Sequence, residues 1–219
     1  MGFNGKLLHV DLSEMKIEEK ELDKEYVKNF LGGTGLAARY ISDLTESDVD
    51  PLSPENPLVF MTGPLTGTGA PNSSRHAVCS YSPLTGIWGE GTSGGEFGMK
   101  LKMAGWDGII VEGKADEMVY LAIEDDEVEI KEGSNLEGLD TYETQDVIKE
   151  DMGEAVSVSC IGQGGENLVN YACIINDEGR ALGRSGMGAV MGSKNLKAVS
   201  VFGTSKSSIE NEEKFTDLT

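Results

Sequence analysis

The sequence is poor in the residues that most often hold metals. It has 2 histidines and 3 cysteines among 219 residues, and no two cysteines are spaced as Cys-x-x-Cys. This argues against a zinc knuckle, an iron–sulfur ligand set and a histidine-based metal site. Cys79, Cys160 and Cys173 are expected to be small buried apolar side chains in a reducing compartment.

Positive charge is also scarce, with 18 Lys and Arg against 38 Asp and Glu and a net charge of −20. Such an acidic chain is a poor partner for nucleic acid or an anionic membrane surface, and a solvated acidic surface is the simpler interpretation. No apolar run is long enough to span a bilayer, and the amino terminus lacks a signal-peptide pattern. A soluble cytoplasmic protein of one large or two small domains is expected.

Arginine is the scarcest charged residue, and its positions are informative. The four arginines are Arg39, Arg75, Arg180 and Arg184. Two of them lie in the glycine-rich segment 179–188, and Arg75 shortly precedes a second glycine-rich segment, 89–98. Guanidinium groups suit phosphate, and glycine lets a backbone approach a ligand closely. This placement favours a site for a large anionic cofactor.

Each arginine also has a simpler explanation. Arg75 suits a surface salt bridge, and Arg180 and Arg184 have carboxylates close by at Asp177 and Glu178. Taken together, these explanations are weaker, because lysine supplies nearly all the remaining positive charge elsewhere. The joint arrangement therefore favours binding.

Alternating and apolar runs predict a mixed α and β fold. Strands are expected over residues 6–12, 16–22, 58–61, 76–81, 108–113, 119–123, 128–130, 156–161 and 171–175. Helices are expected after an Asp23 cap, over 36–44, from segment 89–98 to about Ala104, and over 141–152 with Thr141 as cap.

The chain contains an internal repeat. Its first part pairs residues at a fixed offset of 88: Gly95, Gly98, Met99 and Met103 with Gly183, Gly186, Met187 and Met191. After a two-residue slip, Ile109, Val111 and Gly113 match Val199, Val201 and Gly203. Each half thus predicts a glycine-rich loop, a short helix, a loop, a strand and a glycine.

Neither glycine-rich loop fits a named nucleotide motif. The sequence has no Gly-x-x-x-x-Gly-Lys-Ser/Thr, and residues 32–35 (GGTG) do not complete Gly-x-Gly-x-x-Gly. A glycine-rich loop that opens a helix still presents free backbone N–H groups to an anion. Two related copies would suit a ligand with two phosphates, or two copies of one ligand.

Other candidate residues carry weaker signals. Glu90, Glu96 and Asp107 are possible acid–base groups, although solvation is the default for carboxylates in so acidic a chain. His76 lies beside Arg75 and is a possible ligand contact, although a strand histidine is usually a satisfied side chain. The four repeated methionines, Trp88 and Trp106 are expected to pack in the core.

Several longer motifs resemble one known family. They are residues 32–37 (GGTGLA), 50–56 (DPLSPEN), 63–68 (GPLTGT), 82–86 (SPLTG), 93–95 (SGG), 164–168 (GGENL) and 188–198 (GAVMGSKNLKA). In this order, from about Gly5 to Gly203, the chain resembles the aldehyde ferredoxin oxidoreductases. The resemblance implies a tungsten, or sometimes molybdenum, enzyme with two pyranopterin dithiolenes and a [4Fe–4S] cluster. Such enzymes oxidise aldehydes to carboxylic acids and use ferredoxin as electron acceptor.

The resemblance also implies a fold and a domain organisation. The expected fold is α+β, with two related, mostly antiparallel sheets and short helices forming the base of a bis-pterin site. Residues 1–203 would be the pyranopterin-binding N-terminal domain, and residues 204–219 a polar linker or the start of a further domain. The cluster ligands would lie in downstream domains, so the isolated domain is expected to be inactive. A homodimer is allowed, although the sequence leaves the oligomeric state open.

The resemblance assigns cofactor-binding residues one by one. They are Arg75, Thr92, Ser93, Gly94, Gly95, Arg180, Ala181, Gly183 and Arg184. The main-chain carbonyls of Thr92 and Ala181 would hold a magnesium ion that bridges the two pterin phosphates. Thr92 stands where many members have asparagine, and His76 where relatives often have tyrosine or lysine. An alternative function is a standalone, non-catalytic module that binds or carries an anionic pterin for a partner protein.

Overall fold

The computed structural model describes residues 2–46, 48–206, 209 and 211–219, and it contains two six-stranded sheets. The strands are β1 (Lys6–Asp11), β2 (Lys16–Glu21), β3 (Leu58–Thr62), β4 (His76–Tyr81), β5 (Trp88–Ser93), β6 (Gly108–Glu112), β7 (Val119–Glu124), β8 (Glu127–Glu132), β9 (Ser157–Cys160), β10 (Ile174–Asn176), β11 (Arg180–Leu182) and β12 (Leu196–Phe202). The helices are α1 (Lys24–Phe30), α2 (Thr34–Leu44), α3 (Phe97–Met103), α4 (Thr141–Met152), α5 (Gln163–Glu166), α6 (Met187–Ser193) and α7 (Glu212–Leu218), with a 3₁₀ turn at Ser134–Leu136.

The two sheets have the same topology. Sheet A has the order β2-β1-β6-β3-β4-β5, and sheet B read from its other edge has the order β8-β7-β12-β9-β10-β11. In each sheet one pair is parallel, β1 with β6 and β7 with β12, and the other four pairs are antiparallel. We call residues 6–112 the first unit and residues 119–202 the second unit. The predicted duplicated α+β fold with mostly antiparallel sheets is confirmed.

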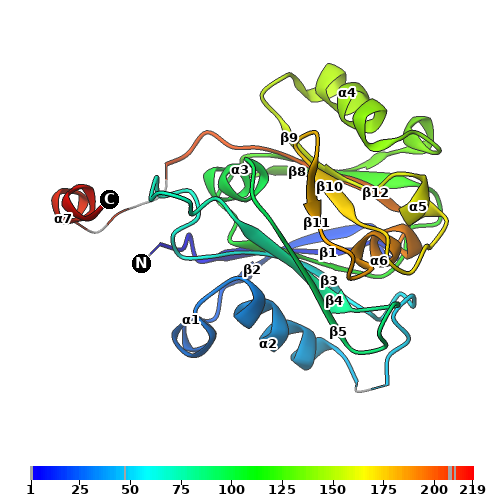
Figure 1. Ribbon diagram of the computed structural model, residues 1–219, viewed down its shortest axis with the longest axis horizontal. Helices are drawn as coiled ribbons and strands as arrows, with labels where there is room; N and C mark the ends of the chain where they lie inside the picture. Colours follow the sequence, from blue (N-terminus) through cyan, green and yellow to red (C-terminus); the bar gives the residue numbers. More distant parts are fainter. Residues whose placement is uncertain (1, 47, 207–208, 210) are drawn as a thin grey trace.

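The sheets pack face to face, and helices cover their outer faces (Figure 1). The largest core lies between the sheets and includes Phe60, Val78, Leu121 and Val199. A second core joins sheet A to α1 and α2, and a third joins sheet B to α4. No helix in the described part of the chain combines the length and apolar character needed to cross a bilayer.

The short helices α3 and α6 cross between the units. Helix α3 of the first unit packs on β9 and β12 of sheet B, and α6 of the second unit packs on β3, β4 and β5 of sheet A. A side chain at Gly203 would lie 2.1 Å from the backbone nitrogen of Ala104, at the end of α3. These crossing contacts hold the units together and bury Met187 and Met191 fully, as predicted. Met99, Met103 and Trp88, which were also expected in the core, are only half-buried.

The internal repeat is confirmed, but its residue-by-residue alignment needs correction. Helices α3 and α6 begin at Phe97 and Met187, and Ile109 and Val199 occupy matching positions in β6 and β12, so the offset is 90 throughout this region. The offset of 88 at the glycine-rich segments is therefore wrong. The repeated glycines and methionines suggested it. The strand rows instead relate Thr92 to Ala181 by an offset of 89, because the connection before α6 is one residue longer than that before α3.

Several element predictions also need correction. The first glycine-rich segment was expected to be a loop, but its first half, residues 89–93, lies in the edge strand β5. Arg180, Ala181 and Leu182 likewise form β11. Helix α4 is capped by Asp140 in a capping box with Glu143, one residue before the expected cap, Thr141. Helix α2 starts at Thr34, two residues earlier than expected, and α5 had no sequence signal.

The carboxyl-terminal segment, residues 204–219, contains helix α7, which Asn211 caps. Residues 207, 208 and 210 of this segment, like residues 1 and 47, lie outside the described part of the chain.

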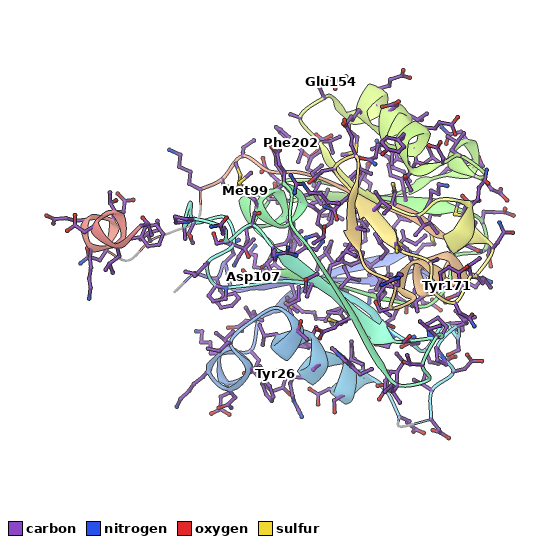
Figure 2. The ribbon with its side chains drawn as sticks, viewed as in Figure 1. Tyr26, Met99, Asp107, Glu154, Tyr171 and Phe202 are labelled. Carbon is purple, nitrogen blue, oxygen red and sulfur yellow. The ribbon has the colours of Figure 1, made fainter. Side chains whose placement is uncertain are left out.

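Asp107 is buried, although its default prediction was a solvated carboxylate. It lies inside the molecule just before β6, where Figure 2 labels it, and its side chain is 0% exposed. Its carboxylate pairs with Lys102 at 2.5 Å and accepts the backbone N–H groups of Asn4, Gly5 and Lys6. Asp107 therefore ties the amino-terminal residues to the α3–β6 connection rather than acting as an acid or a base.

Candidate functional site

Strand pairing places Thr92 and Ala181 at equivalent positions of the two units. In sheet A one row of paired residues runs Leu7, Gly108, Met61, Ala77, Thr92. In sheet B the corresponding row runs Tyr120, Ala198, Cys160, Ile175, Ala181. Gly108 and Ala198 differ by the repeat offset of 90, so the two rows match member by member. Thr92 and Ala181 end these rows, on the edge strands β5 and β11.

These two edge strands lie against each other. A side chain added at Gly91 would lie 3.0 to 3.2 Å from backbone and Cβ atoms of Leu182, so the glycine favours this close approach. The hydroxyl of Ser82 donates to the carbonyl of Ser185 at 2.7 Å and joins the strands' flanking turns. The two segments that the sequence singled out therefore form one continuous surface.

Three of the four arginines lie on this surface without an ion pair among the described residues. Arg39 is the exception, because it pairs with Asp43 at 2.5 Å on α2. Arg75, Arg180 and Arg184 are exposed. Arg75 reaches β5, where one guanidinium nitrogen lies 3.4 Å from both the carbonyl and the hydroxyl oxygen of Thr92.

The simpler explanation for Arg180 and Arg184, a salt bridge to Asp177 or Glu178, is wrong. Glu178 pairs instead with Lys149 at 3.0 Å. Asp177 accepts the hydroxyl of Ser157 and the backbone N–H of Glu96, the latter at 2.5 Å. Among the described residues, neither carboxylate forms an ion pair with Arg180 or Arg184.

The Gly94–Gly95 turn contacts the second unit directly. The amide nitrogen of Asn176 donates to the Gly94 carbonyl at 3.0 Å. A side chain at Gly95, whose φ is +92°, would lie 2.8 Å from Cδ of Arg180 and 2.3 Å from Asp177. The structure thus brings Gly94, Gly95 and Arg180 together.

The prediction that the N–H groups at the helix starts are free is partly wrong. At α3 the Glu96 N–H donates to Asp177, and at α6 the Gly188 N–H donates to the Ala172 carbonyl at 3.0 Å. The backbone N–H groups of Glu96 and Gly188, which were predicted to bind phosphate, therefore bind acceptors within the chain.

The remaining predicted site residues lie on or just below the same surface. Ala181, Gly183 and Arg184 are exposed, whereas Ser93 is buried and donates its hydroxyl to the Gly94 carbonyl at 3.3 Å. Burial raises the pKa of the Cys173 thiol, and the neighbouring Arg184 guanidinium opposes that rise.

Two hollows flank β5. One, of about 340 Å³, is lined by Arg75, Thr92 and the turn that opens α2. The other, of about 490 Å³, lies between α3 and the end of α4. It is lined by Gly95, by the cations Lys100, Lys149 and Arg180, and by the carboxylates Glu96, Glu154, Asp177 and Glu178. Arg75 and Arg180 therefore line separate hollows.

His76 differs from both of its sequence interpretations. It is 2% exposed at the base of the hollow lined by Arg75 and Thr92, and neither ring nitrogen has a hydrogen-bond partner among the described residues. Burial lowers the pKa of His76 to about 4, and the charge of Asp177 only partly opposes this. The ring packs on Phe97, with centroids 4.8 Å apart, and stays neutral behind the glycine turn.

Sequence reasoning missed Asn176 and Asp177, whose side chains hold the Gly94–Glu96 turn. A signal was present, because Asn-Asp-Glu-Gly between two apolar runs has the composition of a hairpin turn. Asp177 and Glu178 both have positive φ, 46° and 66°, in the β10–β11 connection. No sequence signal linked this turn to a segment 81 residues earlier.

The guanidinium groups on this surface suit a phosphate-bearing group, and its main-chain carbonyls suit a hard cation. Guanidinium groups pair with phosphate, and main-chain carbonyls are ligands for magnesium. Among the described residues, no group of three or more His, Cys, Asp or Glu side chains is placed to hold a metal ion.

Comparisons with known proteins agree with the fold. The sequence profile of the family "Aldehyde ferredoxin oxidoreductase, N-terminal domain" matches residues 7–203. Tungsten-containing aldehyde ferredoxin oxidoreductases are 46% identical in Pyrococcus horikoshii, over 99% of this chain and 36% of the relative, and 47% identical in Pyrococcus furiosus, over 96% and 35%. The solved active-site complex BamBC of benzoyl coenzyme A reductase, with 1,5-dienoyl-CoA, superposes with a TM-score of 0.97 at 39% identity. That superposition covers 99% of this chain and 33% of the BamBC chain.

The chain therefore spans about a third of the length of these relatives. The profile match covers nearly all of the duplicated fold, and the relatives are well above 30% identical over that length. The chain belongs to the aldehyde ferredoxin oxidoreductase family, and its duplicated fold is that family's N-terminal domain.

Proposed function

We propose that residues 1–203 are the pyranopterin-binding domain of a tungsten-dependent oxidoreductase that oxidises aldehydes to carboxylic acids and passes the electrons to ferredoxin. One observation carries the proposal: Thr92 and Ala181 end matching rows of the two sheets, on adjoining edges, beside arginines free of ion pairs among the described residues. Molybdenum would suit the same residues. Residues 204–219 would lead into the remaining domains.

In this proposal Arg75, Arg180 and Arg184 bind the phosphates of two pyranopterins. The carbonyls of Thr92 and Ala181 would ligate one magnesium ion between those phosphates, because magnesium prefers oxygen ligands. Threonine in place of asparagine leaves such a role intact, since every residue type provides a main-chain carbonyl.

The residues fit the group because Gly94 and Gly95 leave the turn without side chains beside Arg180. When bound, the tungsten–pterin centre supplies the redox chemistry. This chain binds and orients that centre, and the neutral His76 fills the space behind the glycine turn without adding charge.

Substrate choice would reside in the rest of the protein. This domain is similar both to proteins named for aldehyde oxidation and to a reductase of benzoyl coenzyme A, so it is compatible with different substrates. The cluster ligands would also lie there, since this chain has no Cys-x-x-Cys pair. We therefore expect residues 1–203 alone to show no aldehyde oxidation with a viologen acceptor. Activity of this fragment would contradict the proposal that the rest of the protein is needed for catalysis. A cytoplasmic location and a homodimer belong to the same proposal.

Replacing Arg180 and Arg184 with alanine tests the proposed site. Loss of a hydrogen bond to a charged group weakens binding roughly ten- to a hundredfold. Tungsten, or molybdenum, and pterin should therefore fall together, as measured by elemental analysis and by pterin fluorescence after oxidative release. Arg39→Ala is the matched control, because Arg39 is bound to Asp43 on α2.

Two results would contradict the proposal. One is a wild-type protein that contains neither metal nor pterin after growth with tungstate and molybdate. The other is an unchanged metal and pterin content in the double variant. A protein that carries pterin but no tungsten or molybdenum would favour the non-catalytic carrier module.

A further inference from the structure

We propose that Asn176 and Asp177 of the second unit are positioning residues that hold the Gly94–Glu96 turn of the first unit in register with the Arg180–Arg184 segment. The inference rests on the proposed function for its consequence, and on contacts of this chain alone for its geometry.

The turn is held at both ends by consecutive side chains. Asn176 donates its amide N–H to the carbonyl of Gly94 at 3.0 Å, and Asp177 accepts the backbone N–H of Glu96 at 2.5 Å. Asn176 is fully buried, whereas Gly94 is half-buried. Between these points the turn has only Gly95 to adjust.

The absence of a side chain at Gly95 allows this contact. Its φ of +92° is one that side chains rarely adopt, and a Cβ there would lie 2.3 Å from the carboxylate of Asp177. The close approach of Asp177 and the conformation of Gly95 therefore require each other.

Asp177 also fixes its own side of the contact. Its second carboxylate oxygen accepts the hydroxyl of Ser157, the first residue of β9, and its backbone N–H donates to the Val158 carbonyl at 3.3 Å. Asp177 and Glu178 turn the chain from β10 into β11 with positive φ at both positions. The same residue thus sets where β11 starts, at Arg180, and where the first-unit turn lies.

The consequence is a coupling between the two site segments. Without Asn176 and Asp177, the turn that follows Thr92 would be joined to the second unit mainly by apolar packing. Thr92 and Ala181 could then move relative to each other, and a ligand bridging the units would be held less tightly.

The test uses Asp177→Ala, with Asp177→Asn as the conservative variant. In the purified protein, hydrogen exchange of the Glu96 amide should be about ten- to a hundredfold faster in Asp177→Ala, because this N–H loses a charged acceptor. Tungsten and pterin should be lost on dialysis about tenfold faster than from wild type. Asp177→Asn keeps one oxygen acceptor and should restore much of both properties, which a loss of general stability would not predict.

Glu178→Gln is the matched control, since Glu178 is the next residue, is exposed and, among the described residues, has its ion pair with Lys149. It should leave both measurements unchanged. Unchanged Glu96 exchange in Asp177→Ala would overturn the contact, with or without cofactor. Faster exchange with wild-type retention of tungsten and pterin would overturn the positioning role while leaving the proposed function intact. A wild type without tungsten, molybdenum or pterin would instead refute the proposed function.

Discussion

The two units have one backbone plan but different chemistry at matching positions. Thr92 of the first unit corresponds to Ala181 of the second, and the rows of the sheets then match Arg75 with Cys173 and Asp107 with Lys197. The backbone plan fixes where two equivalent edges meet. The side chains at the two edges differ, with glycines at the turn after β5 and arginines around β11.

The interiors of the units differ in the same way. Asp107 makes a buried pair with Lys102 in the first unit, and Lys197, at the matching position, makes one with Glu166 in the second. A charge at this position thus recurs with opposite sign, and each unit supplies its own partner from a different element. Three comparisons, ordered by expected effect, probe how far the units differ.

The largest effect is expected from breaking the first-unit pair. Asp107→Ala leaves Lys102 buried without a carboxylate and three backbone amides without an acceptor, which should lower the free energy of unfolding by about 3–5 kcal/mol. Glu166→Ala should cost less, because Glu166 is 11% exposed and water can replace it. Urea unfolding of both variants measures the difference; equal losses would mean that the two pairs are equivalent.

The next effect concerns the ends of the crossing helices. Lys194 follows α6 where Ala104 follows α3, and its ammonium donates to the carbonyls of Pro54 and Gly113 with no carboxylate partner among the described residues. Burial lowers the pKa of Lys194 to about 8 from 10.5. Since the folded state then binds fewer protons than the unfolded state, stability should rise by up to about 3 kcal/mol between pH 8 and 10.5.

Lys194→Met removes this dependence. The difference in unfolding free energy between wild type and variant should therefore shift in favour of wild type as pH rises through this window. The measurement is urea unfolding at several pH values from 7.5 to 10.5. Parallel curves for the two proteins would contradict the assignment.

The smallest effects compare glycines in the two site turns. Gly95→Ala would place Cβ 2.3 Å from Asp177 at a φ of +92°, so a loss of about 1–3 kcal/mol is expected. Gly183→Ala meets no atom within 4 Å, and its loss should be within about 0.5 kcal/mol. Thermal unfolding of both variants checks the contrast, and a Gly183→Ala loss as large as that of Gly95→Ala would argue against it.

Much of the fold could be predicted because its signals are local. The alternation over residues 6–12 and 16–22 predicted the β1–β2 hairpin, and Asp23 caps α1 as expected, accepting the N–H groups of Glu25 and Tyr26. Strands β5 and β11 were missed because glycine and arginine have little intrinsic preference for strands. They form strands because β4 and β10 offer them a partner edge.

In the candidate site, too, local features could be predicted and long-range contacts could not. Scarcity and glycine context identified Arg75, Arg180 and Arg184, whose roles stay predictions. The contacts that hold the Gly94–Glu96 turn became visible only in the structure, because Asp177 accepts from Glu96 and Asn176 donates to Gly94 across 81 and 82 residues. No local pattern encodes a contact of that range.

The sequence by itself determined that the chain contains a repeat, that its few arginines gather near glycine-rich segments, and which family it resembles. These properties depend only on residue identity and spacing. The tertiary structure decided that Thr92 and Ala181 are equivalent, that Asp177 is already engaged, and that His76 is buried and neutral. Strand register and the packing of the two units fix those facts, and both arise only when distant segments fold against each other.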